Sequence, residues 1–313
     1  MRIFRHFNNL PGETRDAAIA IGNFDGVHRG HQAVIAEAGR IAGDAGVQWG
    51  VLTFEPHPRR VFKPDSEPFR LTPFRLKARH LEAMGVDFLV VLRFDVAFSR
   101  RPAETFVEEI LVEGLAARHV VSGYDFAFGH ERRGDSELLL RTGRQRGFGF
   151  TCVMALGDEA GEAYSSTRAR GCLRDGDPAG AARVLGRFFE IEGRVARGDE
   201  RGRTIGYPTA NVPLGDYVCP ALGVYAVKAG IDDGPGTVWQ AAVANIGRRP
   251  TFGGDGVVLE AHLFDFDGDL YDRHLRVALV DYLRPEKKFD GIDELKAQIA
   301  DDSSRARQIL ADD

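Results

Sequence analysis

The 313-residue chain has little cysteine, no long apolar run and no excess of basic charge. Its three cysteines, Cys152, Cys172 and Cys219, are too far apart to match a metal site or a disulfide framework. They are typical of small buried side chains in a reducing compartment. No apolar stretch is long enough to cross a bilayer, and residues 1–13 lack the apolar core of a signal peptide. We therefore expect a cytoplasmic protein.

The formal net charge of −5 at pH 7 excludes a general basic field that would attract nucleic acid or a membrane surface. An anionic substrate would have to be held by locally placed arginines, lysines and backbone N–H groups. The length allows two domains with sizeable cores, and the composition is that of an ordinary globular protein. Neither property indicates an oligomeric state.

Short apolar segments alternate with amphipathic segments over the first half of the chain. Strands are expected at 17–21, 47–54, 86–94, 119–123 and 150–156, and helices at 31–43, 75–85, 102–115 and 135–147. This alternation predicts a doubly wound α/β domain with a parallel sheet. Ligands of such sheets bind beyond the carboxyl ends of the strands, so the loops that follow the strands are the candidate site.

The pattern changes in the second half, where apolar and polar residues alternate between Gly, Asp and Pro turns. Six strands are expected at 188–198, 209–214, 223–231, 237–247, 257–266 and 274–283. They predict an antiparallel β-barrel, followed by a closing helix at 291–310. The segment 174–186 reads as a short helix or a linker. We therefore expect two domains, residues 1–184 and residues 185–313.

The stretch GNFDGVHRGH, residues 22–31, directly follows the first predicted strand. Gly22 and Gly26 allow a sharp turn and a close approach to a ligand, and the next helix points its positive end at that turn. His28 and His31 could donate hydrogen bonds to a phosphate whose charge grows during transfer. The alternative is that both imidazoles are surface residues of an ordinary strand–helix turn.

Three further clusters follow strands at the same edge of the predicted sheet. TFEPHPRRVF is residues 53–62, GYDFAFGHERRGD is residues 123–135, and YSSTRAR is residues 164–170. The second is rich in glycine, aromatics and arginine, which suits a flat ring and an anion. The third adds hydroxyls and guanidiniums, and a guanidinium presents a rigid fork to phosphate oxygens.

A second candidate site lies in the barrel half. The loop GDERGRTIGYPTAN, residues 198–211, could close over phosphates, and the Thr209 hydroxyl and the Asn211 carbonyl are hard oxygen ligands suited to Mg²⁺. The alternative is a β-turn in which Thr209 and Asn211 make local hydrogen bonds.

Glu260 belongs to the strand 257–266, where alternation places it on one face with Val258 and Phe264. We expect this face to lie inside the barrel, where a carboxylate needs a partner or a role. One role is that of a general base for a hydroxyl nucleophile. The alternative is a structural ion pair with Arg248 or Arg249.

Taken together, these motifs resemble a known family. H-x-G-H with a later S-S-T-x-x-R resembles the nucleotidyltransferase superfamily. With FEPHP, DFAFG and SSTRAR in this order, the first half resembles the FMN adenylyltransferase module of prokaryotic bifunctional FAD synthetases. PTAN, NIGRRPTF, the strand with Glu260, DFDGDLYD and LRPEKKF are similar to the riboflavin kinase module of the same enzymes. One departure is Leu76 in LTPFRLK, where the family often has an acid.

The resemblance implies a Rossmann-like nucleotidyltransferase domain that adenylylates FMN with ATP. In it, His28 and His31 would stabilise charge on the ATP α-phosphate, and Arg168 with Arg170 would neutralise the pyrophosphate. Asn23 and Asp25 would position nucleotide or metal. The residues implied to bind nucleotide or flavin are Gly22, Asn23, Phe24, Asp25, Gly26, Gly30, Asp125, Phe126, Phe128, Arg132, Ser165, Ser166, Thr167 and Arg170.

For the barrel, the resemblance implies that Glu260 activates the riboflavin 5′-hydroxyl while Thr209 and Asn211 hold Mg²⁺ with ATP. Further implied contacts are Gly202, Arg203, Gly206, Pro208 and Arg249. Both steps are expected to use ATP and Mg²⁺, with riboflavin, FMN and FAD as substrates and products. The alternatives are an enzyme that keeps one activity, a flavin-responsive regulatory protein, and an adenylyltransferase for another phosphate acceptor.

Overall fold

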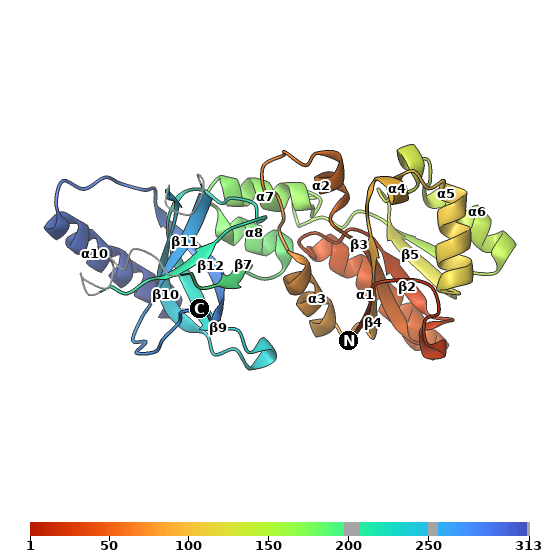
Figure 1. Ribbon diagram of the computed structural model, residues 1–313, viewed down its shortest axis with the longest axis horizontal. Coiled ribbons are helices and arrows are strands. Elements are labelled where there is room, and N and C mark those ends of the chain that lie inside the picture. Colours follow the sequence, from red (N-terminus) through yellow and green to blue (C-terminus); the bar gives the residue numbers. More distant parts are fainter. Residues whose placement is uncertain (197–206, 250–255, 312–313) are drawn as a thin grey trace. The chain divides into compact units, whose positions relative to one another are not determined.

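The computed structural model describes residues 1–196, 207–249 and 256–311 (Figure 1). The chain divides into two compact units. The first contains Met1–Ser66 and Phe74–Tyr164, and the second contains Glu67–Pro73 and Ser165–Asp313. The short segment 67–73 therefore packs with the second unit, although both of its flanks belong to the first.

The first unit is built on a six-stranded parallel sheet, which confirms the predicted fold class. Its strands are β1 (Arg2–Phe4), β2 (Ala18–Ile21), β3 (Trp49–Glu55), β4 (Phe88–Arg93), β5 (His119–Gly123) and β6 (Gly149–Val153). The strand order is β1-β4-β3-β2-β5-β6. The chain moves outward from β2 to β4 in one direction and from β5 to β6 in the other. The topological switch point, where such sheets bind ligands, therefore lies between β2 and β5.

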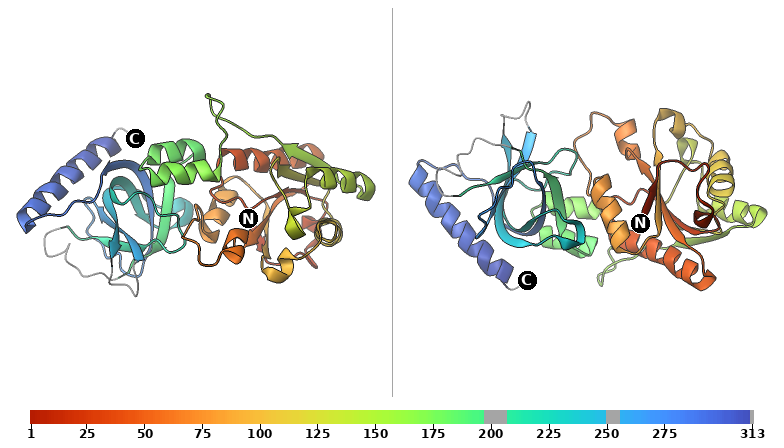
Figure 2. Two further views of the ribbon diagram at one scale, coloured as in Figure 1. Left: turned by 90° about the horizontal axis from the view of Figure 1, so that it is seen from above. Right: turned by 60° about the horizontal axis from the view of Figure 1, so that its bottom comes forward.

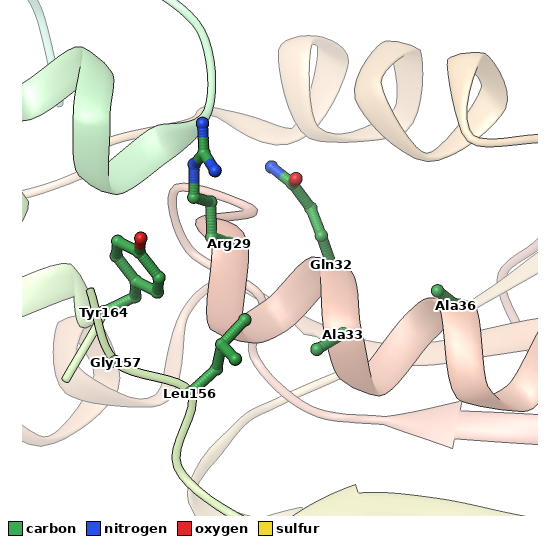
Figure 3. A pocket seen from close by; sticks show the side chains of 7 residues that line it. All are labelled: Arg29, Gln32, Ala33, Ala36, Leu156, Gly157 and Tyr164. Atoms are coloured by element: carbon green, nitrogen blue, oxygen red, sulfur yellow. The ribbon is translucent and has the colours of Figure 1, made fainter. Parts of the chain in front are cut away.

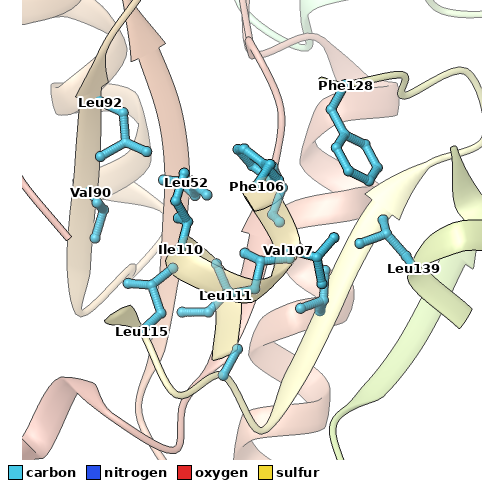
Figure 4. Packing of buried hydrophobic residues seen from close by; sticks show 14 of the residues in the cluster. Leu52, Val90, Leu92, Phe106, Val107, Ile110, Leu111, Leu115, Phe128 and Leu139 are labelled. Atoms are coloured by element: carbon cyan, nitrogen blue, oxygen red, sulfur yellow. The ribbon is translucent and has the colours of Figure 1, made fainter. Parts of the chain in front are cut away.

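Helices cover both faces of this sheet, and each face has its own core. The helical elements are η1 (Gly12–Thr14), α1 (Arg29–Ala45), α2 (Pro58–Phe62), α3 (Phe74–Ala83), α4 (Val96–Ser99), α5 (Ala103–Phe106), η2 (Val107–Gly114), η3 (His130–Arg132) and α6 (Ser136–Arg146). Successive side chains of β2 point to opposite faces: Ile19 and Ile21 join the cluster that includes η2, shown in Figure 4, and Ala20 joins the cluster beside α1. The sheet is thus buried on both sides, as the continuous apolar strands predict.

One predicted helix, residues 102–115, has two parts. It begins as α5 and continues as η2, which is a π-helix whose end is marked by the Leu115 N–H bonded to the Ile110 carbonyl at 2.8 Å. Apolar periodicity predicts a helix here but does not distinguish the wider turn. The π-helical turn brings Val107, Ile110 and Leu111 together against the sheet, all fully buried.

The second unit is an antiparallel barrel of the six predicted strands (Figure 2). They are β7 (Phe189–Arg194), β8 (Ala210–Pro213), β9 (Gly223–Ile231), β10 (Gln240–Arg249), β11 (Gly256–Leu263) and β12 (His274–Arg284), in the order β7-β12-β9-β10-β11-β8. An isolated bridge between Ala196 and Asn211, with the Ala196 N–H 2.9 Å from the Asn211 carbonyl oxygen, joins the two ends of the sheet.

Among its described residues, this unit also contains the helices α7 (Ser166–Arg174), α8 (Pro178–Leu185), η4 (Gly234–Gly236) and α10 (Ile292–Ala311). The last helix packs on β9 and β10 and is tied to β12 by the ion pair between Arg284 and Asp302, whose carboxylate is 3% exposed. Among the residues that the structure describes, no helix is long and apolar enough to cross a membrane.

Candidate active sites

The turn after β2 is held by two buried residues in an unusual backbone conformation. Phe24 and Val27 have φ angles of 48° and 40°, and both side chains are buried. Residues other than glycine rarely adopt positive φ, and such strain persists only where the surroundings fix it. A Cβ on Gly22 would lie 2.9 Å from the Phe24 ring, so glycine is required beside it. The sequence predicted the turn but not that Phe24 anchors it.

His28 and His31 meet at the start of α1. His28 is the N-cap, and its Nδ1 accepts a hydrogen bond from the His31 N–H at 3.3 Å. In the neutral ring this bond leaves the proton on Nε2, which is therefore a donor. The two rings stack with centroids 3.5 Å apart. The pair is thus suited to donate hydrogen bonds to an anion from the start of α1.

The positions around the two imidazoles are closely packed and could not take larger side chains. The Phe24 ring meets the His31 ring edge-on, with centroids 5.3 Å apart. A Cβ on Gly30 would come within 3.1 Å of the His28 ring and 3.2 Å of the Tyr164 carbonyl oxygen. The structure therefore brings Gly22, Phe24, His28, Gly30 and His31 into one cluster, with Asn23, Asp25 and Gly26 in the same turn.

A hollow of about 460 Å³ opens beside the first turn of α1 (Figure 3). It is lined by Arg29, Gln32, Ala33, Ala36, Leu156, Gly157 and Tyr164. The Arg29 guanidinium lies over the Tyr164 ring at 5.8 Å, and the Gln32 amide donates to the Val27 carbonyl at 2.8 Å. The hollow is thus lined by a guanidinium and an amide from the first turn of α1, and the sequence motifs had not pointed to either residue.

Aromatic side chains gather at the carboxyl ends of β3, β4 and β5. Phe62 is 63% exposed and contacts Phe94, with ring centroids 5.8 Å apart. Phe126 is half-buried and stacks on Phe128, which is 6% exposed and belongs to the core. The exposed aromatic surface thus includes Phe62, Tyr124, which is 53% exposed, and part of Phe126. Two further residues with predicted binding roles, Asp125 and Arg132, are exposed in the same loop.

The hydroxyls and arginines at 165–170 lie at the start of α7, in the second compact unit. Ser165 caps the helix by accepting the Arg168 N–H at 3.1 Å. Arg170 donates to the Phe69 carbonyl at 2.7 Å and lies over the Phe69 ring at 5.6 Å. Ser166 and Thr167 belong to the first helical turn. The imidazoles belong to the first unit and these residues to the second. The roles predicted for Arg168, Arg170 and the hydroxyls at the ATP phosphates therefore stay predictions.

In the barrel, Glu260 lies between two asparagines. It is the cross-strand partner of Asn211 on β8 and of Asn245 on β10, so the three side chains share one face of the sheet. Asn245 also donates to Glu286 at 3.4 Å. The sequence pointed to Glu260 and Asn211, whereas the position of Asn245 follows from the register alone.

The prediction that Glu260 faces the barrel interior is wrong. Leu259 and Ala261 are fully buried and pair with Ile246 and Ala244, so their face fills the interior. Glu260 is half-buried on the outer face. Val258 and Phe264 are nevertheless buried because this face is covered in part, and Phe264 packs in the cluster that includes Ala306 of α10.

The PTAN segment packs along this outer face. The His262 ring makes a 2.9 Å hydrogen bond with the Pro208 carbonyl and an edge contact with Tyr207. Asn211 is 5% exposed, and its Oδ1 has no hydrogen-bond partner among the described residues. A buried carbonyl oxygen without a partner fits a hard cation such as Mg²⁺, and Thr209, two residues earlier, is half-buried. Gly202, Arg203, Gly206 and the Arg249 side chain lie outside the described residues.

Comparison with known proteins assigns both halves of the chain. Residues 10–168 match the FAD synthetase family, and residues 185–310 match the riboflavin kinase family. The chain is 43% identical over 312 residues to the bifunctional riboflavin kinase/FMN adenylyltransferase of Escherichia coli K12, covering 99% of this chain and 98% of that protein. The chain belongs to this bifunctional family.

Other relatives span both units. The bifunctional riboflavin kinase/FMN adenylyltransferase of Bacillus subtilis is 38% identical over 299 residues, or 94% of this chain and 92% of that protein. A crystal structure titled macrolide-efflux protein from Streptococcus pneumoniae is 31% identical, with a TM-score of 0.85, and the match covers 98% of this chain and 99% of that one. The imidazole pair lies in the range matched by the FAD synthetase family, and Glu260 in the range matched by riboflavin kinase.

Proposed function

We propose that this family member catalyses two successive reactions. Residues 185–313 phosphorylate riboflavin with ATP to give FMN, and residues 1–184 transfer AMP from a second ATP to FMN, giving FAD and pyrophosphate. The observation that carries this proposal is that each matched family range contains its own polar site. The range matched by the adenylylating family contains the stacked His28 and His31, and the kinase range contains Glu260 between Asn211 and Asn245.

In adenylyl transfer, an FMN phosphate oxygen attacks the α-phosphorus of ATP, and the bond to the β-phosphate oxygen breaks. His28, with its proton on Nε2, and His31 donate hydrogen bonds to the α-phosphate oxygens as charge grows there. Arg168 and Arg170 neutralise the departing pyrophosphate, and Ser165, Ser166 and Thr167 bind its oxygens. No covalent enzyme adduct is needed, because positioning and electrostatic stabilisation suffice for this chemistry.

The flavin ring of FMN needs a flat apolar surface. Phe62 and Phe126 supply it at the carboxyl edge of the sheet, with Phe128 supporting Phe126 from the core. Asp125 and Arg132 of the same loop provide polar contacts to the flavin. Asn23 and Asp25 help to position the nucleotide.

In the kinase step, Glu260 accepts the proton of the riboflavin 5′-hydroxyl as its oxygen attacks the γ-phosphorus and ADP leaves. Thr209 and Asn211 would hold Mg²⁺ through their oxygens, and the buried Asn211 Oδ1, which has no hydrogen-bond partner among the described residues, supports this role. When bound, Mg²⁺ neutralises phosphate charge in the transition state. Gly202, Arg203, Gly206, Pro208 and Arg249 complete the phosphate site.

The proposed setting is the cytoplasm. Cys152, Cys172 and Cys219 are free thiols, which fits a reducing compartment. ATP, riboflavin and FMN are the small-molecule partners, and neither nucleic acid nor a membrane takes part.

The test is to incubate the purified chain with riboflavin, ATP and Mg²⁺ and to separate the flavins by chromatography over time. FMN should appear first and FAD should follow, and chelation of Mg²⁺ with EDTA should stop both. FMN without FAD, or FAD formed only from added FMN, would show that a single activity is retained. No conversion of either flavin would contradict the proposal.

A further inference from the structure

A fully buried lysine lies beneath the GNFDG turn. Lys77 of α3 has a solvent exposure of 0%, and its Nζ donates to the Asn23 carbonyl oxygen at 2.8 Å and to Glu55 Oε1 at 3.1 Å. The Thr53 hydroxyl oxygen is 3.5 Å from the same nitrogen. Burying an ammonium group is costly unless it is paired and hydrogen-bonded, so this lysine is committed to these acceptors.

The Asn23 carbonyl connects the side chains of Lys77 and Thr53 to the GNFDG turn. It accepts a hydrogen bond from Lys77 and a second from the Thr53 hydroxyl at 3.2 Å. The carbonyl belongs to the peptide plane between Asn23 and Phe24. Holding that plane restricts rotation about the adjacent N–Cα bond of Phe24, whose φ is 48°.

Phe24 in turn contacts the reacting region. Its ring packs edge-on against His31, which stacks on His28. A peptide plane free to rotate would let Phe24 relax to negative φ, which an L residue prefers, and would withdraw its ring from His31. Lys77 is thus linked to the imidazoles through the Asn23 carbonyl and the Phe24 ring.

We propose that Lys77 is a positioning residue for adenylyl transfer, which holds the Asn23 carbonyl so that His28 and His31 stay aligned for the α-phosphate. This proposal rests on the assignment of adenylyl transfer to the two imidazoles. Glu55 balances the charge of Lys77, and Thr53 provides the second donor to the same carbonyl. The positioning role requires the Lys77 ammonium group, which donates to the Asn23 carbonyl. If Lys77 and Glu55 had only a structural role, a pair of uncharged side chains that fill the same space would serve equally well.

The experiment uses full-length Lys77→Met and the double variant Lys77→Met/Glu55→Gln, which removes both buried charges. For each, kcat and KM for FMN adenylylation, riboflavin kinase activity and the melting temperature are measured. Lys77→Met leaves Glu55 without its buried counter-charge and should melt lower than wild type. The double variant should recover most of that loss, yet kcat for FAD formation should stay lower by about 10- to 100-fold, the range expected for a misplacement near 1 Å. KM and the kinase activity should change little.

Arg284→Met is the matched control, because it breaks a buried ion pair in the other unit. It should lower the melting temperature and leave kcat for FMN adenylylation at the wild-type value. The positioning role is refuted if Lys77→Met keeps normal kcat, or if the double variant recovers stability and kcat together. His28→Ala tests the site assignment separately from the positioning role. Normal FAD formation in that variant refutes the assignment of adenylyl transfer to the imidazoles. Loss of FAD formation in His28→Ala, together with a normal kcat in Lys77→Met, refutes only the positioning role.

Discussion

At the scale of single residues, the function proposed for the kinase half rests on the carboxylate of Glu260. Glu260→Gln keeps the size and the hydrogen-bonding capacity of the side chain but removes the base. We expect riboflavin phosphorylation to fall by about 10²- to 10⁴-fold, the usual contribution of a positioned base, with FMN adenylylation unchanged. Initial rates of FMN formation measure the effect.

Asp265→Asn is the matched control, because it neutralises an exposed carboxylate of the same unit that pairs with Arg307. Its kinase rate should equal that of wild type. Normal FMN formation by Glu260→Gln would mean that another group takes the proton.

His119, the first residue of β5, provides a test of how the stability of the fold depends on pH. Burial lowers its pKa from the ordinary 6.5, and its Nε2 is 2.8 Å from the Thr151 hydroxyl oxygen. Below pH 6.5 the unfolded chain therefore binds the proton more readily than the folded chain, so this residue's contribution to stability is present above pH 6.5 and is lost as the pH falls below it.

The expected result is that the denaturation midpoint falls less steeply between about pH 7 and 5 in His119→Gln than in wild type. Urea titrations at several pH values measure it. Equal slopes for the two proteins would show that His119 titrates alike in the folded and unfolded chains.

Glu260 also shows what sequence reasoning could and could not predict about a residue. Strict alternation correctly grouped Glu260 with Val258 and Phe264 on one face of the strand. Both faces carry large apolar side chains, so the pattern could not tell which one fills the barrel. The outer face is apolar here because α10 covers part of it, and that packing is a property of the folded chain.

At the scale of elements, the first turn of α1 is the part of the adenylyltransferase half most sensitive to added volume. Gly30→Ala would place a methyl group 3.1 Å from the His28 ring and 3.2 Å from the Tyr164 carbonyl oxygen. The imidazole has to shift, so FAD formation from FMN should fall by about tenfold or more, with the kinase rate unchanged. Steady-state rates of the two reactions measure the difference.

Gly43→Ala is the control in the same helix, because a Cβ there meets nothing within 4 Å. It should keep both activities and raise helix stability by up to about 1 kcal/mol, since alanine is the better helix former. Equal losses of FAD formation in both variants would place the cause in the helix as a whole and not in the crowding of His28.

The elements themselves were predictable to different degrees. Long amphipathic helices and continuous apolar strands follow from periodicity, and α1, α3, α6 and α10 lie where the pattern places them. The three-residue β1 was missed because Arg2, Ile3 and Phe4 are too few to show a period. The left-handed Phe24 could not be foreseen, because the Asn23 carbonyl before it is hydrogen-bonded to Thr53 and Lys77, which are distant in the sequence.

At the scale of the whole molecule, two compact units share one chain. The change from helix–strand alternation to strand–turn alternation predicts two domains, residues 1–184 and 185–313, whereas the compact units divide after Tyr164 and place 67–73 with the second unit. The strand order and register of the two candidate sites came only from the structure. Parallel pairing of β2 with β5 places the GNFDG turn at the switch point, and antiparallel pairing of β8, β10 and β11 places Glu260 between two asparagines. Such pairings join segments up to about a hundred residues apart, which local patterns do not specify.

The most direct test of two separate sites is complementation between variants that each lack one. Glu260→Ala and His28→Ala are assayed alone and as a mixture, with riboflavin, ATP and Mg²⁺, and the flavins are separated by chromatography. We expect no flavin nucleotide from Glu260→Ala, FMN without FAD from His28→Ala, and FAD from the mixture, because FMN made by one molecule diffuses to the other. No FAD from the mixture, no FMN from His28→Ala, or FAD made from riboflavin by either variant alone, would contradict the account.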